Sequence, residues 1–93
     1  MIASFRDPET ERLWQSGKSR GLPPDLHRRA FKKLAILNAA VALENLRVPP
    51  GNHLEALTGR RAGQHSIRIN DQFRVCFVWR SGSAFGVEIV DYH

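Results

Sequence analysis

The sequence has few of the features that mark secreted, membrane-spanning or disulfide-bonded proteins. Its 93 residues include one cysteine, Cys76, which excludes an internal disulfide and a cysteine-based metal cluster. It contains no apolar run long enough to cross a bilayer, and Arg6, Asp7 and Glu9 place charge where a secretory signal would be apolar. We therefore expect a soluble, cytoplasmic protein in which the lone thiol is a small packed side chain.

Motifs of the common cofactor-dependent and nucleophilic enzymes are missing as well. The sequence has no phosphate-binding P-loop, no dinucleotide-binding glycine pattern and no nucleophile elbow. His27, His53 and His65 are not spaced as metal ligands, so we expect no zinc site and no cofactor. The length suits one small core, which predicts a single domain over residues 1–93.

Positive charge is what the sequence has in excess. Lysine and arginine outnumber the acids by 14 to 9, which gives a formal net charge of +5. The hydrophobic fraction of 42% and the charged fraction of 25% are ordinary for a folded domain. This balance favours an anionic partner, namely nucleic acid, a membrane surface or an acidic protein. The alternative is a basic surface that contacts only solvent.

The first half of the chain predicts two helices that follow a short strand over residues 1–5. The sequence Asp7-Pro8-Glu9 opens a helix that should end near Ser16, because Gly17 follows. Pro23-Pro24-Asp25 opens the longest helix. Its apolar stripe has residues three or four positions apart: Leu26, Ala30, Leu34, Leu37 and Val41.

Basic residues of the longest helix, Arg28, Arg29, Lys32 and Lys33, lie largely off that stripe and form a basic face. On a helix such a run is most often the solvated side, but it could equally contact RNA phosphates or an acidic partner. One more helical turn is expected over residues 43–46, and the prolines that follow should end helical structure.

The second half alternates with a period of two, as strands do. Apolar residues share one face of a strand over 66–69 and of another over 73–80, which leaves Arg68 and Arg74 on the opposite face. A three-residue loop over 70–72 sets Arg68 opposite Arg74 and keeps each face consistent, whereas a two-residue loop would mix the faces.

The same reasoning, applied to a loop over 81–83, predicts a second hairpin that pairs Trp79 with Phe85, Phe77 with Val87 and Val75 with Ile89. The outcome is an antiparallel meander with one apolar face for the longest helix to cover. Like charges that oppose each other on a sheet are unfavourable. The pair Arg68 and Arg74 therefore predicts a bound anion, or a nearby acid such as Glu55 or Glu88.

The last residues, Asp91-Tyr92-His93, bring three proton-transfer groups to the end of the final strand. Metal-free RNA scission needs a group that takes the proton of the 2′-hydroxyl, a group that protonates the leaving oxygen, and cations beside the phosphate. His93 with Arg74 and Arg68 would meet two of these needs, and Tyr92 or Asp91 the third.

A strand that stays regular would place Tyr92 on the arginine side and Asp91 and His93 away from it. The catalytic interpretation therefore requires the final residues to leave the regular pleat. The alternative interpretation is a solvated terminal histidine beside an ordinary strand-end acid.

The closing segment 87–93, together with the arginine strand around Arg74, forms the most specific pattern of the chain. With the segments 1–5, 49–57, 59–70 and 72–74, it resembles the HigB-type toxins of bacterial type II toxin–antitoxin systems, within the RelE/ParE superfamily. The resemblance covers essentially the whole chain.

This resemblance implies a compact α+β fold of the microbial-RNase type, with an antiparallel sheet packed against N-terminal helices. It implies a ribosome-dependent mRNA endonuclease that needs no metal and inhibits translation. The implied partners are the ribosome, mRNA and a cognate HigA-like helix-turn-helix antitoxin, and the toxin–antitoxin complex is expected to bind operator DNA. No membrane partner is implied.

Site residues follow from the same resemblance. Asp91, Tyr92 and His93 match the catalytic end of the family, Arg74 matches its phosphate-stabilising arginine, and Gln72 falls where a polar residue helps to position mRNA. The further residues expected to bind RNA are Arg68 and, from the basic loop over 59–63, Arg60 and Arg61.

The chain departs from some family members at two positions. Where those members carry a His and a Lys, this chain has Glu55 and Thr58. Either Glu55 serves as the general base or the activity is weaker. Two other functions remain open: a non-catalytic toxin of the same fold that acts by binding, as gyrase poisons do, and a basic RNA- or ribosome-binding module.

Overall fold

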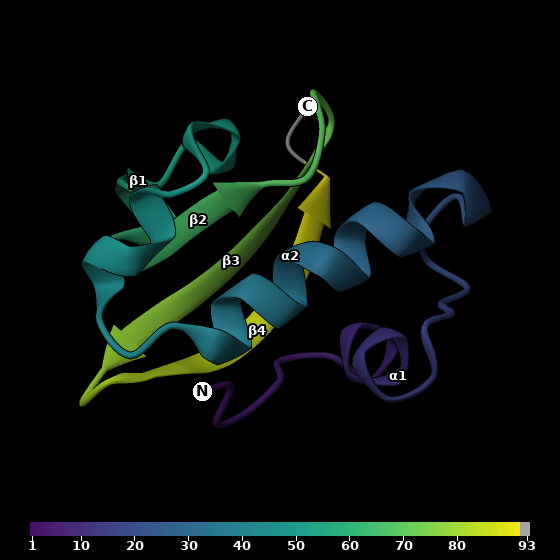
Figure 1. Cartoon of the computed structure of the whole chain (residues 1–93), viewed down its shortest axis with the longest axis horizontal. Coiled ribbons are helices and arrows are strands. Elements are labelled where there is room, and N and C mark those ends of the chain that lie inside the picture. Colours follow the sequence, from purple (N-terminus) through teal and green to yellow (C-terminus); the bar gives the residue numbers. More distant parts are fainter. Residues whose placement is uncertain (92–93) are drawn as a thin grey trace.

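Figure 1 shows the computed structural model of the chain, in which residues 1–91 are described. A four-stranded antiparallel sheet is ordered β1 (Glu55–Ala56), β2 (His65–Arg68), β3 (Phe73–Arg80) and β4 (Ser83–Asp91). Two helices, α1 (Pro8–Ser16) and α2 (His27–Ala39), pack against the sheet, and α2 crosses one of its faces. The predicted α+β class, with an antiparallel sheet packed against N-terminal helices, is confirmed.

Helix α1 begins and ends where its capping residues predict. The Asp7 carboxylate accepts a hydrogen bond from the N–H of Thr10 (3.3 Å). Gly17, at φ 78°, ends the helix and returns its N–H to the carbonyl of Leu13. The buried hydroxyl of Thr10 accepts a hydrogen bond from the N–H of Ile89 (3.1 Å), which fixes α1 to β4.

Helix α2 starts later than its prolines suggest, because Pro24–Leu26 form a short 3-10 turn ahead of it. Its buried residues are Ala30, Leu34 and Leu37, as the apolar stripe predicts. The assignment of Val41 to that stripe is wrong. The helix ends at Ala39 and the backbone turns extended, so Val41 lies beyond it and is 79% exposed.

Short 3-10 segments, Leu43–Arg47 and Pro50–Asn52, connect α2 to β1, and the first of them is the helical turn expected there. The connection is fixed by the fully buried side chain of Asn52. Its amide donates to the carbonyls of Leu46 (3.1 Å) and Val48 (3.3 Å). Its Oδ1 accepts a hydrogen bond from Lys33 of α2 (2.6 Å), so helix and connection are held together.

The N-terminal segment does not form the separate strand predicted over residues 1–5. It runs beside β4 in parallel, with isolated bridges between Ile2 and Ala84 and between Phe5 and Val87. Those bridges place the segment against the second half of the chain, where Ile2 and Phe5 pack on the core.

The first hairpin has the predicted register, with Ile67 opposite Val75 and Arg68 opposite Arg74. The second hairpin does not. Its turn is the residue pair Ser81 and Gly82, both with positive φ (53° and 79°), and Trp79 lies opposite Ala84 rather than Phe85.

A β-bulge restores the predicted register further along that hairpin. Between the pairs Val78–Phe85 and Cys76–Glu88, β3 contributes Phe77 alone and β4 contributes both Gly86 and Val87. Gly86 adopts φ 59°, the left-handed conformation that a bulge glycine supplies. Val75 therefore lies opposite Ile89 as predicted.

The two faces of the sheet have different coverings. Ile67, Val75 and Phe77 face the helices and form the core with the buried leucines of α1 and α2. Ser66 and Cys76 are paired on the opposite face and are also fully buried, so the packed setting predicted for Cys76 is confirmed. None of the helices within residues 1–91 is long and apolar enough to span a bilayer.

Candidate functional site

The sheet face opposite the helices carries the residues that the sequence singles out. Cross-strand partners share a face, so Ser66 with Cys76 and Glu88 forms one row, and Arg68 with Arg74 forms the next. We call this surface the arginine face and define it by those five residues.

Arg74 is held in one orientation from two sides. Its Nε donates to the hydroxyl of Ser66 (2.7 Å), and its Nη2 donates to the backbone carbonyl of His53 (2.6 Å). His53 has left-handed backbone angles (φ 44°, ψ 57°), an uncommon conformation for a residue other than glycine. Both acceptors are neutral groups, and the two bonds hold the guanidinium in place.

The side chain of Arg68 forms an ion pair with that of Asp71, which lies in the turn between β2 and β3. An acid near the arginine pair is one of the two predicted alternatives, and Asp71 is that acid. Glu88 instead binds Arg61 (3.2 Å) and Arg6 (3.5 Å), nearer the β4 edge. Glu55 is exposed in β1 and pairs with Ser66, the residue that also binds Arg74.

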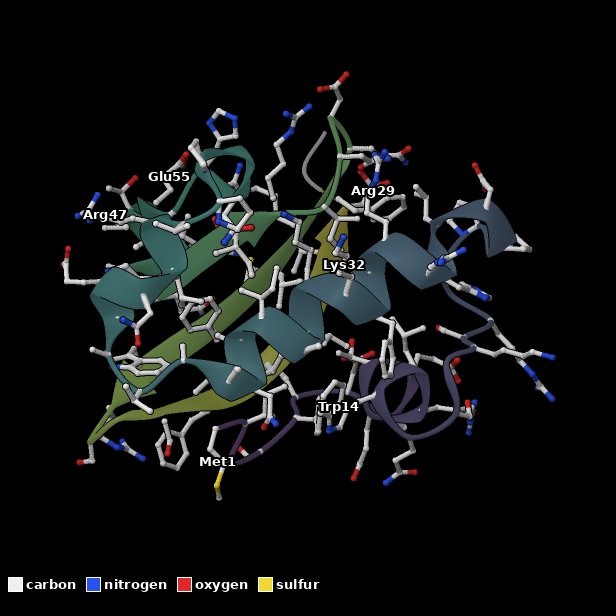
Figure 2. All side chains as sticks on the ribbon, in the orientation of Figure 1. Met1, Trp14, Arg29, Lys32, Arg47 and Glu55 are labelled. Atoms are coloured by element: carbon white, nitrogen blue, oxygen red, sulfur yellow. The ribbon has the colours of Figure 1, made fainter. Side chains whose placement is uncertain are left out.

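Positive charge continues from Arg68 onto α2. Burial lowers the pKa of Lys33, and the neighbouring charges of Lys32, Arg29 and Arg68 lower it further. Arg68 of the sheet therefore lies within electrostatic reach of Lys33 on α2. We call Arg29, Lys32 and Lys33 the basic flank of α2, and Figure 2 shows Arg29 and Lys32 on the side of that helix away from Trp14 of α1.

The end of β4 lies beside the turn between β2 and β3 (Figure 1). Asp91 is the register partner of Phe73, and its Oδ2 accepts a hydrogen bond from the side-chain amide of Gln72 (3.0 Å). The strand stays regular to this point, so Val90 shares the side of Arg74 and Asp91 does not. Tyr92 and His93 lie outside the described residues, and their roles stay predictions.

Arg60 and Arg61, predicted to bind RNA, line a polar hollow of about 300 Å³ together with Arg6, Gln64 and Glu88. Arg61 donates to Gln64 (3.1 Å) as well as to Glu88. Since Glu88 belongs to the arginine face, the hollow lies on the same side of the sheet as Arg68 and Arg74, toward β4.

Sequence reasoning missed three groups that shape this site. Ser66 lies two residues before Arg68 and so shares its face, a signal that alternation could have revealed. The backbone of His53 gave no readable signal, because its left-handed conformation is set by the loop around it. The contact of Lys33 with Asn52 joins residues 19 positions apart, and no local pattern predicts such a pair. Within residues 1–91, no group of three or more His, Cys, Asp or Glu side chains could hold a metal ion.

Comparison with solved structures gives the fold class of this small α+β domain. The fold matches a chain in the YoeB–YefM complex of Staphylococcus aureus, with a TM-score of 0.62 over 100% of this chain and 98% of that one. The sequence identity is 13%, so this likeness concerns the fold alone.

Sequence comparison gives the family. The family described as the RelE-like toxin of the type II toxin–antitoxin system HigB matches residues 3–93. The chain is 41% identical to Toxin HigB-1 of Vibrio cholerae serotype O1 over 85 residues, 90% of each protein. It is 33% identical over 78 residues to an uncharacterized protein of Haemophilus influenzae, covering 83% of this chain and 77% of that protein. The chain belongs to the HigB-like toxins of type II toxin–antitoxin systems, and the predicted resemblance is confirmed. An antitoxin is therefore its partner.

Proposed function

We propose that this toxin is a ribosome-dependent mRNA endonuclease that stops translation in the cytoplasm. The observation that carries the proposal is the fixed guanidinium of Arg74, set beside Arg68 on the arginine face and next to the end of β4. A guanidinium fork gives two charge-assisted hydrogen bonds to a phosphate, and it stabilises charge that builds up as the phosphate reacts.

The reaction requires no metal. The 2′-oxygen of one nucleotide attacks the adjacent phosphorus, the bond from phosphorus to the 5′-oxygen breaks, and a cyclic phosphate forms. One protein group takes the 2′-hydroxyl proton and another gives a proton to the leaving 5′-oxygen. We assign this proton transfer to His93 and Tyr92, with Asp91 as an alternative, and charge stabilisation to Arg74.

Glu55 is the second candidate for the general base. It pairs with Ser66, whose hydroxyl binds Arg74, so a carboxylate and the fixed guanidinium have a common neighbour. Gln72 is held by Asp91 and would position the mRNA strand. Arg68, Arg60 and Arg61 would bind backbone phosphates on the same side of the sheet.

The identity of 41% to Toxin HigB-1 supports a cognate antitoxin of the HigA type. That antitoxin would carry a helix-turn-helix, and the toxin–antitoxin complex would bind operator DNA through it. The toxin's own targets would be mRNA and the ribosome.

Induced expression of the wild-type protein beside His93→Ala and Arg74→Ala tests the proposal. The wild type should arrest growth and leave mRNAs cut within codons, and both variants should lose growth arrest and cleavage. Unchanged arrest and cleavage in both variants would sink the assignment. The order of events separates a binding-only toxin from a nuclease, since protein synthesis should stop before DNA replication does.

A further inference from the structure

A second surface lies between the end of α1 and the start of α2, and the proposed RNA chemistry does not use it. Trp14 and Phe31 stack there with ring centroids 5.2 Å apart and an interplanar angle of 26°. Phe31 remains 38% exposed. The two rings line a hollow of about 750 Å³, which we call the aromatic groove. Pro24 adds to its apolar lining, and Lys18, His27 and Arg28 add polar and charged groups.

Arg29 and Lys33 of the basic flank lie on the opposite side of α2 from the aromatic groove. At 3.6 residues per turn, positions 27 and 31 lie to one side of the buried stripe and positions 29 and 33 to the other, whereas Arg28 and Lys32 lie one turn apart on the exposed side. Figure 2 shows this division, with Trp14 on the α1 side of α2 and Arg29 on the far side. The basic run therefore keeps the single face predicted for it, and Arg28 at one edge of that face also lines the groove.

The connection that carries Lys18 is fixed from both ends. The Glu9 carboxylate accepts hydrogen bonds from the N–H of Arg20 (2.9 Å) and the hydroxyl of Ser19 (3.3 Å). The backbone bond from Arg20 is the main reason that the pKa of Glu9 is lowered. The N–H of Lys18 donates to the Ser16 hydroxyl (3.3 Å), so the edge of the groove is preformed.

This combination fits a protein helix better than a nucleic acid. Partly exposed aromatic side chains with an adjacent arginine are the residues that anchor protein interfaces. The Trp14 and Phe31 rings stack on each other, so the faces that a base would use are already partly covered. None of the residues within 1–91 that line the groove is acidic, whereas Lys18 and Arg28 are positive. A complementary partner therefore carries carboxylates around an apolar stripe.

We propose that the aromatic groove binds an acidic amphipathic helix of the antitoxin, with apolar side chains one turn apart on Trp14 and Phe31 and carboxylates on Lys18 and Arg28. This rests on the antitoxin partner of the family, and only the expectation for RNA cleavage rests on the proposed nuclease function. An antitoxin held there contacts the flank of α2 opposite to the one that continues into the arginine face. Antitoxin affinity and RNA cleavage should then be lost by different substitutions.

The test compares two double charge reversals on exposed positions of the same protein, Lys18→Glu/Arg28→Glu at the groove and Arg29→Glu/Arg47→Glu outside it. The probe is the purified antitoxin encoded beside the toxin gene, titrated by calorimetry at physiological salt. The groove pair should weaken binding by about 30-fold or more and the outer pair by less than about threefold, although both pairs change the net charge equally. Phe31→Ala should weaken binding by about tenfold.

Equal weakening by the two pairs, or no weakening by the groove pair, overturns the proposal. The proposal also fails if the groove pair keeps antitoxin affinity but loses affinity for a single-stranded RNA oligonucleotide, because the groove would then be an RNA site. Thermal unfolding of each variant checks that the fold is kept. A wild-type protein that cuts no RNA would defeat the proposed nuclease function, yet the comparison of antitoxin affinities would still decide the occupant of the groove.

Discussion

The two flanks of α2 carry cations of the same kind in opposite surroundings. On one flank, Lys33 is half-buried against Asn52 and lies within electrostatic reach of Arg68, so its charge joins a polar, hydrogen-bonded surface. On the other flank, Arg28 lines a hollow with the aromatic rings of Trp14 and Phe31. A basic run on a helix does not by itself define one surface, because the neighbouring elements decide what each charge can bind.

The difference extends to how each surface is built. The arginine face depends on directional bonds, such as those that hold Arg74 to Ser66 and to the carbonyl of His53. The aromatic groove depends on contact area, which orients a partner less strictly. The first arrangement suits a reaction at one phosphate, and the second suits the docking of a helix.

The largest expected difference in stability is between a variant of the buried Asn52 amide and a variant of the Phe31 ring in the aromatic groove. Asn52→Ala removes three hydrogen bonds from a fully buried side chain, one of them to the ammonium of Lys33. It should lower the free energy of unfolding by about 2–3 kcal/mol. Phe31→Ala should lower it by about 1 kcal/mol, because Phe31 is 38% exposed and loses less buried area.

Urea unfolding followed by circular dichroism measures both values. Equal destabilisation by the two substitutions, or more by Phe31→Ala, would contradict this comparison. Hydrogen bonds would then not be what stabilises the Asn52 side of α2, and Phe31 would not be an accessible apolar surface on the other side.

A smaller effect is expected when the support of Arg74 is weakened. Ser66→Ala removes the acceptor of the Nε–H while the bond to the His53 carbonyl remains. Cleavage of ribosome-bound mRNA at saturating substrate should slow by about tenfold, since a hydrogen bond that involves a charged group is worth about 1.5 kcal/mol. Antitoxin affinity should not change. An unaltered cleavage rate would show that the serine does not orient the guanidinium.

The elements that sequence predicted well are those with local causes. Asp7 and Gly17 bound α1 because capping depends on residues a few positions apart. The opposition of Arg68 and Arg74 followed from alternation within two short strands. The second hairpin failed at Trp79 because a tight turn and the extra residue at Gly86 compensate each other, and alternation alone cannot reveal a bulge.

The site was predictable in its position on the sheet but not in its internal contacts. Alternation placed both arginines on one face, yet Glu88 was directed to Arg61 and Arg6 by a loop whose path the sequence does not show. Similarly, the helical stripe gave the buried face of α2, but the division of its cations depends on where α1 and Asn52 lie.

The smallest effect concerns Cys76, on the arginine face but fully buried. Burial raises the pKa of its thiol, so at neutral pH the native protein holds the protonated, unreactive form. Iodoacetamide should therefore modify the native protein only through unfolding, at a rate that rises steeply with urea. Rapid alkylation without denaturant would mean that this part of the arginine face opens readily. Cys76→Ser should leave antitoxin affinity unchanged.

The central claim is that Arg74 is the phosphate-stabilising group of a nuclease site, and one paired measurement tests it. Arg74→Ala is compared with Arg80→Ala, an exposed arginine that packs over Phe85 at the other end of β3. The two positions lie about 20 Å apart along the strand. Single-turnover cleavage of an mRNA on the ribosome should fall by about 100-fold or more for Arg74→Ala. It should stay within about twofold for Arg80→Ala, since exposed substitutions away from a site have small effects. Equal rates for Arg74→Ala and the wild type would contradict the account.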